Sequence, residues 1–326
     1  MISILNLEPK GYSSEAKAIL SAVGKVENGP LSRVQLIHKI PKYDVMIVRL
    51  THQIDKEIID KAARLKLISS ATTGLNHIDT EYAKENNIHV ISLRGDTEFL
   101  EEIYATAEHT WALILALIRN IPQAVHSVKE GNWNRDLFKG SELNGKTLGI
   151  IGLGRIGKKV ANYGLAFGMT VIAYSGDNSE STYGVQMTNS LKSLLEKSDV
   201  VSLHLPLNSS SYKMMGKDQF FSMKKGAVII NSSRGEITDE DALIDAIKTG
   251  HLSGAALDVI TNETEIHNLK RSRIILFAKE NGRLIITPHI GGATFESMEK
   301  TEIFMAEKLV YYFQGKFQKS KNKKIN

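Results

Sequence analysis

The chain of 326 residues contains no cysteine. This absence excludes disulfides, thiolate metal ligands and cysteine nucleophiles, and because it fits a reducing compartment we expect a cytoplasmic protein. A long apolar run is also missing, since the longest one, Trp111–Ile118, is too short to cross a bilayer. The N-terminus has no basic segment followed by an apolar one, so no signal peptide is expected.

An excess of positive charge is missing as well once the C-terminus is set aside. The formal net charge is +5, and residues 315–326 carry five lysines and no acid, so the rest of the chain is near neutral. A frayed, solvated tail explains these lysines better than an arm that binds nucleic acid. We therefore expect neither nucleic acid nor a membrane as a partner, and we expect no metal site.

What the sequence does contain is a βαβ pattern in residues 147–175. The apolar run Leu148–Ile151 predicts a buried strand, and Thr170–Tyr174 is rich in β-branched residues and predicts a second one. Between them, Arg155–Phe167 has apolar residues at helical spacing.

Three glycines, Gly152, Gly154 and Gly157, follow the first of these strands in G-x-G-x-x-G spacing. The first permits a tight turn, the second lets backbone approach a pyrophosphate, and the third lets the helix pack on the strand. The helix N-terminus then offers free N–H groups and the positive end of its dipole to the phosphates. With a strand before it and a helix after it, the motif predicts dinucleotide binding rather than a merely structural turn.

Strand and helix patterns alternate along the whole chain, which predicts parallel sheets covered by helices. In the first hundred residues the expected strands are Ile2–Asn6, Asp44–Arg49, Leu67–Ala71 and His89–Leu93, and the expected helices are Ser13–Ala22, Asp55–Lys61 and Asp79–Asn86. Beyond residue 146 the expected strands are Leu148–Ile151, Thr170–Tyr174, Asp199–Leu205, Ala227–Ile230, Ser253–Leu257 and Leu284–Thr287. Long helices are expected from Glu98 to Arg119, connecting the two regions, and from Ala293 to Gln314, returning to the first.

Polar side chains follow several of these strands, where α/β sheets bind ligands. Arg234, Glu263 and His289 follow strands of the cofactor unit or lie within a few residues of one. Singly, the arginine fits a surface ion pair and the glutamate a solvated carboxylate. Together, an acid–base group, a carboxylate and a guanidinium predict a hydride-transfer site. Arg49 ends a strand of the first region, where it could meet an anionic substrate group or only an acidic neighbour.

The chain resembles the D-isomer-specific 2-hydroxyacid dehydrogenases, the family of phosphoglycerate, D-lactate, formate and glycerate dehydrogenases. The resemblance covers nearly the whole chain in order. The matching stretches are TGLNHID at 73–79, TAE at 106–108, GKTLGIIGLGRIG at 145–157, HLP at 204–206, NSSRG at 231–235, ALDV at 256–259 and TPHIGG at 287–292.

The resemblance implies an α/β protein of two doubly wound parallel-sheet domains with a cleft between them. A flavodoxin-like substrate domain is expected at 1–100 and 294–326, and a Rossmann domain that binds NAD(P) at 101–293. The implied activity is that of an NAD(P)-dependent D-2-hydroxyacid dehydrogenase, or 2-keto acid reductase. A homodimer is also implied, with 120–145 as the expected interface segment. Within it, Lys129–Leu143 could be an arm that packs on another subunit or only a long loop.

Residue roles follow from the same resemblance. His289 is implied as the general acid and base, Glu263 as its partner, and Arg234 as the group that binds the substrate carboxylate. The backbone of Thr73, Gly74 and Leu75 is implied as a second carboxylate contact. The implied cofactor contacts are Thr106, Gly152, Gly154, Arg155, Ile156, Gly157, His204, Pro206, Ser232, Ser233, Asp258 and Gly291.

Two departures from the family pattern affect these expectations. Where an acidic residue normally ends the second strand, this chain has Ser175, with Asp177 two residues later. The carboxylate that favours NAD is thus displaced, but no arginine or lysine follows before Lys192, so NAD is expected and NADP is not excluded. After Glu263 the chain continues with Thr264 and Glu265, which makes Glu265 a lesser candidate for the carboxylate role.

Two other functions remain open at this stage. A dinucleotide-sensing binding protein, such as a corepressor, would keep the fold without needing Arg234, Glu263 and His289 together. A relative with the same fold could also act on another substrate, such as formate or phosphite.

Overall fold

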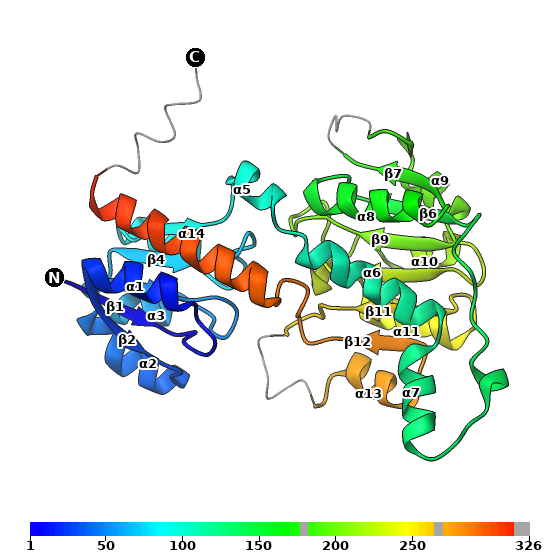
Figure 1. Ribbon diagram of the computed structural model, residues 1–326, viewed down its shortest axis with the longest axis horizontal. Coiled ribbons are helices and arrows are strands. Elements are labelled where there is room, and N and C mark those ends of the chain that lie inside the picture. The colour runs from blue at the N-terminus through cyan, green and yellow to red at the C-terminus, as the bar shows by residue number, and fades with distance from the viewer. Residues whose placement is uncertain (177–181, 264–269, 316–326) are drawn as a thin grey trace. The chain divides into compact units, whose positions relative to one another are not determined.

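The computed structural model describes residues 1–176, 182–263 and 270–315. The chain forms two compact units, one of Met1–Ile103 with the chain from Ala293 onward, and one of Tyr104–Gly292 (Figure 1). Each unit is an α/β structure with one sheet of parallel strands.

The sheet of the first unit has the strand order β2-β1-β3-β4-β5, and every neighbouring pair is parallel. Its strands are β1 (Ile2–Asn6), β2 (Gly24–Asn28), β3 (Val45–Ile47), β4 (Leu67–Ser70) and β5 (His89–Ser92). This is the order of flavodoxin-like folds, in which ligands bind beyond the carboxyl ends of the strands. The flavodoxin-like prediction for this unit is therefore confirmed.

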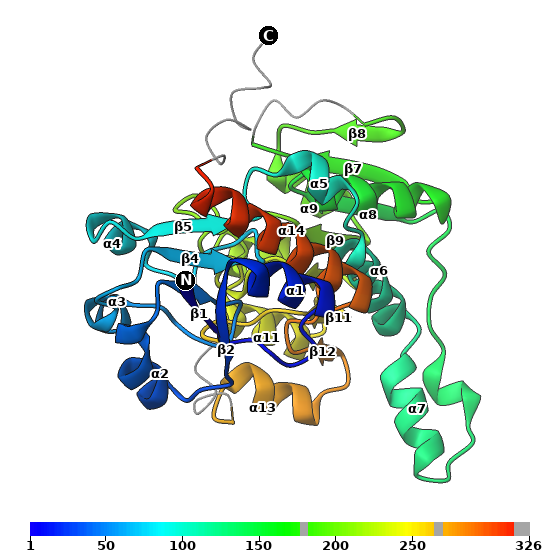
Figure 2. The ribbon, with the colours of Figure 1, turned by 60° about the vertical axis from the view of Figure 1, so that its left-hand side comes forward.

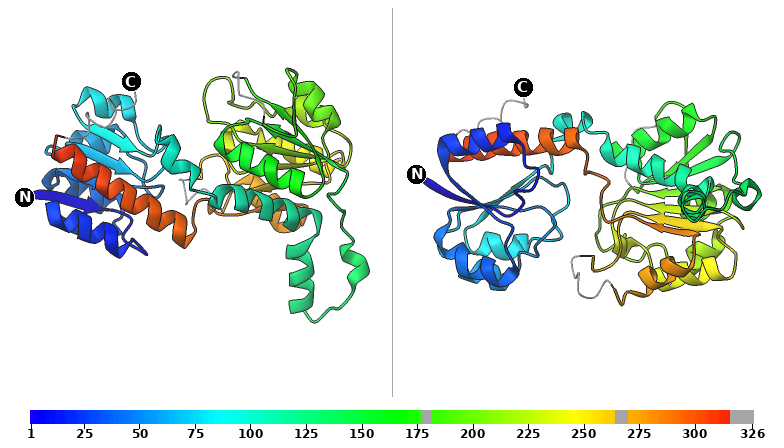
Figure 3. Two further views of the ribbon diagram at one scale, coloured as in Figure 1. Left: turned by 45° about the horizontal axis from the view of Figure 1, so that its top comes forward. Right: turned by 60° about the horizontal axis from the view of Figure 1, so that its bottom comes forward.

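Helices cover both faces of this sheet. They are α1 (Ser14–Val23), α2 (Arg33–Lys39), α3 (Lys56–Lys61), α4 (Thr80–Glu85), α5 (Thr97–Glu101) and α14 (Phe295–Phe313). On one face α1 and α14 lie side by side and bury Leu20, Met305 and Leu309 against the strands (Figure 3). On the other face α2, α3 and α4 pack through a second apolar cluster that includes Leu36 and Ile58.

The sheet of the second unit has the order β12-β11-β10-β9-β6-β7-β8. Its strands are β6 (Thr147–Ile151), β7 (Thr170–Tyr174), β8 (Val185–Met187), β9 (Val200–Leu203), β10 (Val228–Asn231), β11 (Gly254–Leu257) and β12 (Leu284–Ile286). In sequence order this is the Rossmann arrangement 3-2-1-4-5-6 with one further parallel strand, so the Rossmann prediction is confirmed. The order reverses beside β6, which places the glycine-rich turn at the point where such sheets bind dinucleotides.

Two helix layers enclose this second sheet. The helices are α6 (Ala105–Ile118), α7 (Ile121–Lys129), α8 (Arg155–Ala166), α9 (Leu191–Lys197), α10 (Lys217–Ser222), α11 (Glu240–Lys248) and α13 (Arg273–Glu280), with short 3-10 turns η2 (Arg135–Phe138) and η3 (Gly235–Ile237). One face is covered by α6 and α8, whose Trp111 and Val160 join its apolar cluster. The other is covered by α9, α10, α11 and α13, with Phe220 fully buried.

The segment formed by α7 and η2 departs from this layered pattern. It extends away from the rest of the second unit as an arm, which we define as residues 120–140 (Figure 2). Pro122 lies in the first turn of α7, where a proline costs the helix no hydrogen bond. No residue of α7 is buried.

The structure corrects several element predictions. The helix expected from Glu98 to Arg119 is wrong, because the chain forms α5 and α6 with a break at Glu102–Tyr104. The strands β2 and β8 were not predicted, and neither were the helices α2, α7, α9, α10, α11 and α13. Both unpredicted strands lie at sheet edges, where fewer apolar residues are needed, so their patterns are weak. Among the helices within the described residues, none is long and apolar enough to cross a membrane.

Candidate functional site

The glycine-rich turn after β6 is shaped by two close approaches and one open space. Gly152 has φ of +96°, and a Cβ there would lie 2.4 Å from the backbone oxygen of His204. A Cβ on Gly157 would lie 2.2 Å from the oxygen of Gly152, so this glycine lets α8 pack on the turn. Around Gly154, by contrast, a Cβ would meet nothing within 4 Å.

This open side of the turn fits a pyrophosphate. Gly154 is the N-cap of α8, and the first N–H groups of that helix have no acceptor within the helix itself. A side chain at Gly154 would fill the space that a phosphate needs. The residues present thus fit a dinucleotide, which would be held through backbone N–H groups and the helix dipole.

The strands beside this turn bring further predicted residues to the same edge of the sheet. The His204 N–H donates to the oxygen of Ile151 at 2.8 Å, and its Nε2 lies 2.9 Å from Ser202 Oγ. Burial lowers the pKa of His204 to about 3, so its ring is neutral at pH 7. Ser232 Oγ contacts Thr110 Oγ1 of α6 at 2.6 Å, which ties the end of β10 to this helix.

The imidazole of His289 is oriented by a carboxylate. His289 Nδ1 lies 2.5 Å from Glu263 Oε1, and the two side chains are 25% and 29% exposed. With Nδ1 engaged, Nε2 is the ring atom left to exchange a proton with a substrate. A carboxylate at this distance fixes the orientation of the ring.

The backbone around His289 is held in an unusual conformation. His289 has φ of +53°, which is rare for a residue with a side chain. Its N–H donates to the backbone oxygen of Asp258 at 2.9 Å, and the next two N–H groups, of Ile290 and Gly291, donate to the Asp258 carboxylate at 2.9 and 2.7 Å. Three consecutive N–H groups bonded to one buried aspartate thereby hold the backbone that carries the histidine.

Asp258 is itself held by side chains from two elements. Thr287 Oγ1 donates to its Oδ1 at 2.6 Å, and His109 Nε2 of α6 lies 3.2 Å from the same oxygen. Burial raises the pKa of this carboxyl, but the hydrogen bonds outweigh burial and the net pKa is lowered, so Asp258 is a carboxylate. Its implied contact with the cofactor stays a prediction, and would fall to Oδ2, which accepts only from Gly291 within the described residues.

Arg234 lies on the loop between β10 and η3, braced against the loop that carries Glu263. A Cβ on Gly235 would lie 2.1 Å from the backbone carbon of Ile260, so only glycine allows the two loops to touch. Asn231 Nδ2 donates to the Arg234 oxygen at 2.8 Å, and Arg234 Nη1 donates to Ser233 O at 2.5 Å. Burial lowers the pKa of Arg234, and the nearby charge of Glu263 opposes this shift.

Comparison with known proteins decides the family. Residues 111–291 match the family model described as D-isomer specific 2-hydroxyacid dehydrogenase, NAD binding domain. The chain is 37% identical over 319 residues to D-3-phosphoglycerate dehydrogenase of Methanocaldococcus jannaschii, covering 97% of this chain and 58% of that protein. It is 36% identical over 285 residues to hydroxypyruvate reductase of Thermotoga maritima, covering 87% of this chain and 90% of that one. This chain belongs to the D-isomer specific 2-hydroxyacid dehydrogenase family.

A solved structure of this family agrees with the fold. D-lactate dehydrogenase of Aquifex aeolicus, solved with NAD and lactic acid, superimposes with a TM-score of 0.84 at 31% identity, covering 98% of this chain and 97% of that one. The resemblance drawn from the sequence motifs is confirmed, and so is the second unit as an NAD-binding domain. The chain spans only 58% of the length of the Methanocaldococcus jannaschii D-3-phosphoglycerate dehydrogenase and 52% of that of its counterpart from Archaeoglobus fulgidus.

Other predicted site residues of this dehydrogenase-family chain lie at the carboxyl edge of the first unit's sheet. The loop after β4, which carries Thr73, Gly74 and Leu75, is braced by Thr72 Oγ1, which donates to the Gly74 oxygen at 2.8 Å. Arg49 follows β3 and forms an ion pair with Glu302.

At the end of β7, in the second unit, Ser175 is half-buried. Asp177 and Glu265 lie outside the described residues.

Sequence reasoning missed three residues whose side chains contact predicted site residues. His109 and Thr110 lie one turn after the predicted Thr106 on α6, and Thr287 directly follows β12, two residues before His289. Helical spacing from Thr106 could have pointed to the first two, because residues three and four apart share a face. Their partners, Asp258 and Ser232, are far away in sequence, so the contacts themselves had no local signal.

Proposed function

We propose that this protein is an NAD-dependent D-2-hydroxyacid dehydrogenase that also works as a 2-keto acid reductase. The observation that carries the proposal is the contact between His289 Nδ1 and Glu263, with Arg234 on an adjoining loop of an NAD-binding domain. A protein that only senses the dinucleotide has no need of an imidazole oriented in this way.

The proposed chemistry divides between cofactor and protein. The nicotinamide, when bound, supplies the hydride that reaches C2 of the keto acid or receives it from the hydroxy acid. His289 Nε2 gives a proton to the keto oxygen in reduction and takes it back in oxidation. Glu263 contacts Nδ1 and keeps the ring in its orientation. Arg234 binds the substrate carboxylate, for which its planar pair of N–H donors is suited.

The loop of Thr73, Gly74 and Leu75 supports a second role in carboxylate binding. Ser70 Oγ contacts both Thr72 Oγ1 at 2.9 Å and the buried His77 Nε2 at 3.2 Å, so the loop is anchored at each end. A loop anchored in this way presents its backbone N–H groups without a large loss of entropy on binding.

The test is nicotinamide absorbance with NADH, and separately NADPH, and a panel of 2-keto acids. Glyoxylate, pyruvate, hydroxypyruvate, phenylpyruvate and 2-ketoisocaproate vary the size and polarity of the side group. Oxidation of NADH by at least one of them is expected. If NADH binds but no keto acid is reduced, the dehydrogenase proposal fails and the sensor function gains support.

Replacing Ser175 with Asp should strengthen the preference for NADH over NADPH by about tenfold, because a carboxylate would bind the adenine ribose and repel a 2′-phosphate. The preference is measured as the ratio of dissociation constants by fluorescence titration. Thr170→Asp, at the opposite and exposed end of β7, is the matched control. An unchanged ratio would place cofactor selectivity elsewhere.

We propose that the protein is a homodimer and that the arm of residues 120–140 forms the interface. On α7, Ile121, Val125 and Val128 are spaced along one helical face and are 46%, 48% and 50% exposed. Farther along the arm, Trp133 and Leu137 are 89% and 69% exposed. Several large apolar side chains exposed on one arm are typical of protein interfaces, and twofold dimers are the commonest assembly.

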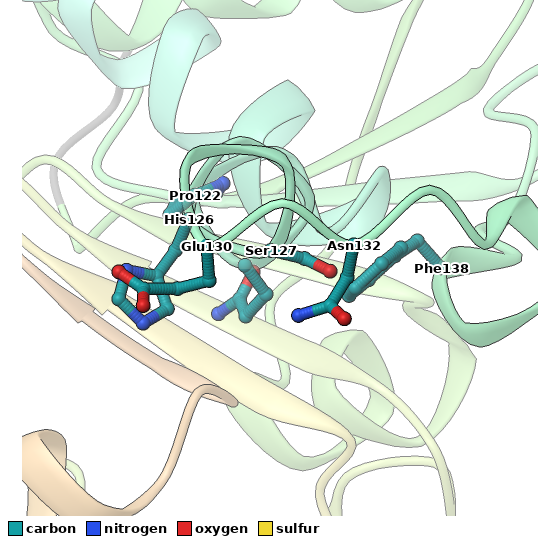
Figure 4. A pocket seen from close by; sticks show the side chains of 7 residues that line it. Pro122, His126, Ser127, Glu130, Asn132 and Phe138 are labelled. Carbon is teal, nitrogen blue, oxygen red and sulfur yellow. The ribbon is translucent and has the colours of Figure 1, made fainter.

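The arm also contains a hollow. It is lined by Pro122, Gln123, His126, Ser127, Glu130, Asn132 and Phe138 (Figure 4). Figure 4 shows Phe138 facing the side of α7 across this hollow. In a twofold interface the same hollow and the same apolar side chains would meet their copies.

The double change Trp133→Glu and Leu137→Glu should convert the dimer into a monomer, since it places four charges in the interface of two chains. Light scattering after size-exclusion chromatography measures the mass. Tyr183→Glu, at a residue that is 97% exposed but outside the arm, should leave the dimer intact. A wild-type protein that is monomeric at tens of micromolar would rule out this interface.

A further inference from the structure

Arg49 stands at the carboxyl end of β3, in a sheet of the type that binds ligands at that edge. Its Nη1 lies 3.2 Å from Glu302 Oε1, and the two side chains are 18% and 2% exposed. The guanidinium is therefore partly open to a ligand, while the carboxylate that balances its charge is buried beneath the surface. The partner comes from α14, 253 residues later in the chain.

Glu302 is held in a fixed position within the first unit. Its Oε2 accepts a hydrogen bond from the backbone N–H of Ser13 at 2.7 Å, which joins it to the start of α1. Tyr12, next in sequence, is also buried. Burial raises the pKa of Glu302, and the Ser13 N–H and Arg49 oppose this change by stabilising the carboxylate.

A second carboxylate lies at the same edge. Glu8 Oε1 accepts from the backbone N–H groups of Arg49 and Thr51 at 3.1 and 3.2 Å, and from Thr51 Oγ1 at 2.6 Å. The charged groups at this edge are thus the guanidinium of Arg49 and the carboxylates of Glu302 and Glu8. An arginine that binds a phosphate needs its positive charge available, because the attraction and the fork-like hydrogen bonds both depend on it.

We infer that Glu302 is a specificity-determining residue, which neutralises Arg49 so that the enzyme selects 2-keto acids with an uncharged side group over phosphorylated ones. This inference rests on the proposed function and narrows its substrate class. Arg49 remains a partly exposed donor for a neutral hydroxyl or carbonyl. A phosphate there would face the charges of Glu302 and Glu8, and like charges in a partly buried place oppose binding strongly.

The experiment compares kcat/KM for hydroxypyruvate and 3-phosphohydroxypyruvate with NADH, because the two differ only by the phosphoryl group. The wild-type protein should favour hydroxypyruvate by about tenfold or more, and Glu302→Gln should shift the ratio toward the phosphorylated substrate by about tenfold, the size expected for one hydrogen bond to a charged group. Glutamine keeps the shape and an oxygen for the Ser13 N–H. Adding Arg49→Gln to Glu302→Gln should remove the gain.

Glu299→Gln is the matched control, since it makes the same charge change on an exposed part of α14 one turn earlier. It should leave the ratio unchanged. A wild-type preference for the phosphorylated substrate would overturn the inference, as would a Glu302→Gln ratio equal to that of the wild type. The wild-type comparison stands even if the variant does not fold.

A binding measurement separates this inference from the proposed function. Calorimetric titration of the wild-type protein and of Glu302→Gln, each saturated with NADH, uses D-glycerate and 3-phospho-D-glycerate, which the reduced cofactor cannot oxidise, so no turnover occurs. The expected result is a gain of about tenfold in relative affinity for the phosphorylated acid in the variant. If no keto acid is reduced but this shift occurs, the proposed function fails and the role of Glu302 stands. If turnover occurs and the shift does not, only the inference about Glu302 fails.

Discussion

His289→Gln is expected to lower kcat by about 10²–10⁴, the usual contribution of a positioned acid–base group, while the dissociation constant for NADH changes less than about twofold. Glutamine can still donate a hydrogen bond but does not exchange a proton near neutral pH. The ring is held through Nδ1 by Glu263 rather than by the glycine-rich turn, so cofactor binding should not depend on it. Stopped-flow turnover and fluorescence titration of NADH measure the two quantities separately.

The control for this variant is His38→Gln, an exposed histidine in the last turn of α2, which should leave kcat unchanged. Far-ultraviolet circular dichroism confirms that both variants keep the fold. Equal losses of turnover and NADH affinity in His289→Gln would argue against an acid–base role, because they would indicate general damage to the second unit.

Arg234→Ala is expected to lower kcat/KM by about 10²-fold, since it removes charge-assisted hydrogen bonds to a carboxylate in a partly buried place. Arg234→Lys should recover only a small part of the loss, because lysine keeps the charge but not the planar pair of donors. The loss should fall on both KM and kcat. Steady-state kinetics across keto-acid concentrations at saturating NADH give the two values.

Arg283→Ala is the matched control for this prediction. Arg283 is exposed in the turn before β12, within the same unit, and its loss should not change either constant. If Arg234→Ala had wild-type kinetics, the carboxylate would have to be bound by other groups, and the role given to Arg234 would be withdrawn. A fall in thermal stability with no change in kinetics would give this arginine a structural role only.

The sequence predicted the site best where the chemistry is local. The strand β6, the glycines and the helix α8 are consecutive, so spacing alone placed Gly152, Gly154 and Gly157 correctly between them. Helices were also expected to begin at Asp55 and Asp79, and each aspartate is an N-cap whose side chain accepts the N–H three residues on. Such signals depend on residues within one helical turn of each other. These residues are close in sequence, so the sequence alone shows them.

Prediction failed where a segment's state depends on distant packing. The expected helix from Glu98 to Arg119 breaks at Glu102–Tyr104, where the chain leaves one compact unit and enters the other. Nothing in the local helix propensity marks this boundary, since tertiary contacts override weak propensities. The edge strand β2 was missed because most of its residues are polar or glycine, and its pairing with β1 is what makes it a strand.

By itself, then, the sequence determined the two parallel-sheet units, the family and the dinucleotide turn, and it supplied the residues of the proposed catalytic set, because each corresponds to a short sequence pattern with its own physical cause. Only the tertiary structure decided which side chains meet. It joined Glu263 to His289, held the histidine loop through Asp258, and placed Glu302 against Arg49 across 253 residues. Charge pairing at such separations depends on how the helices and strands pack, so the chemistry of Arg49 could not be known before the fold was.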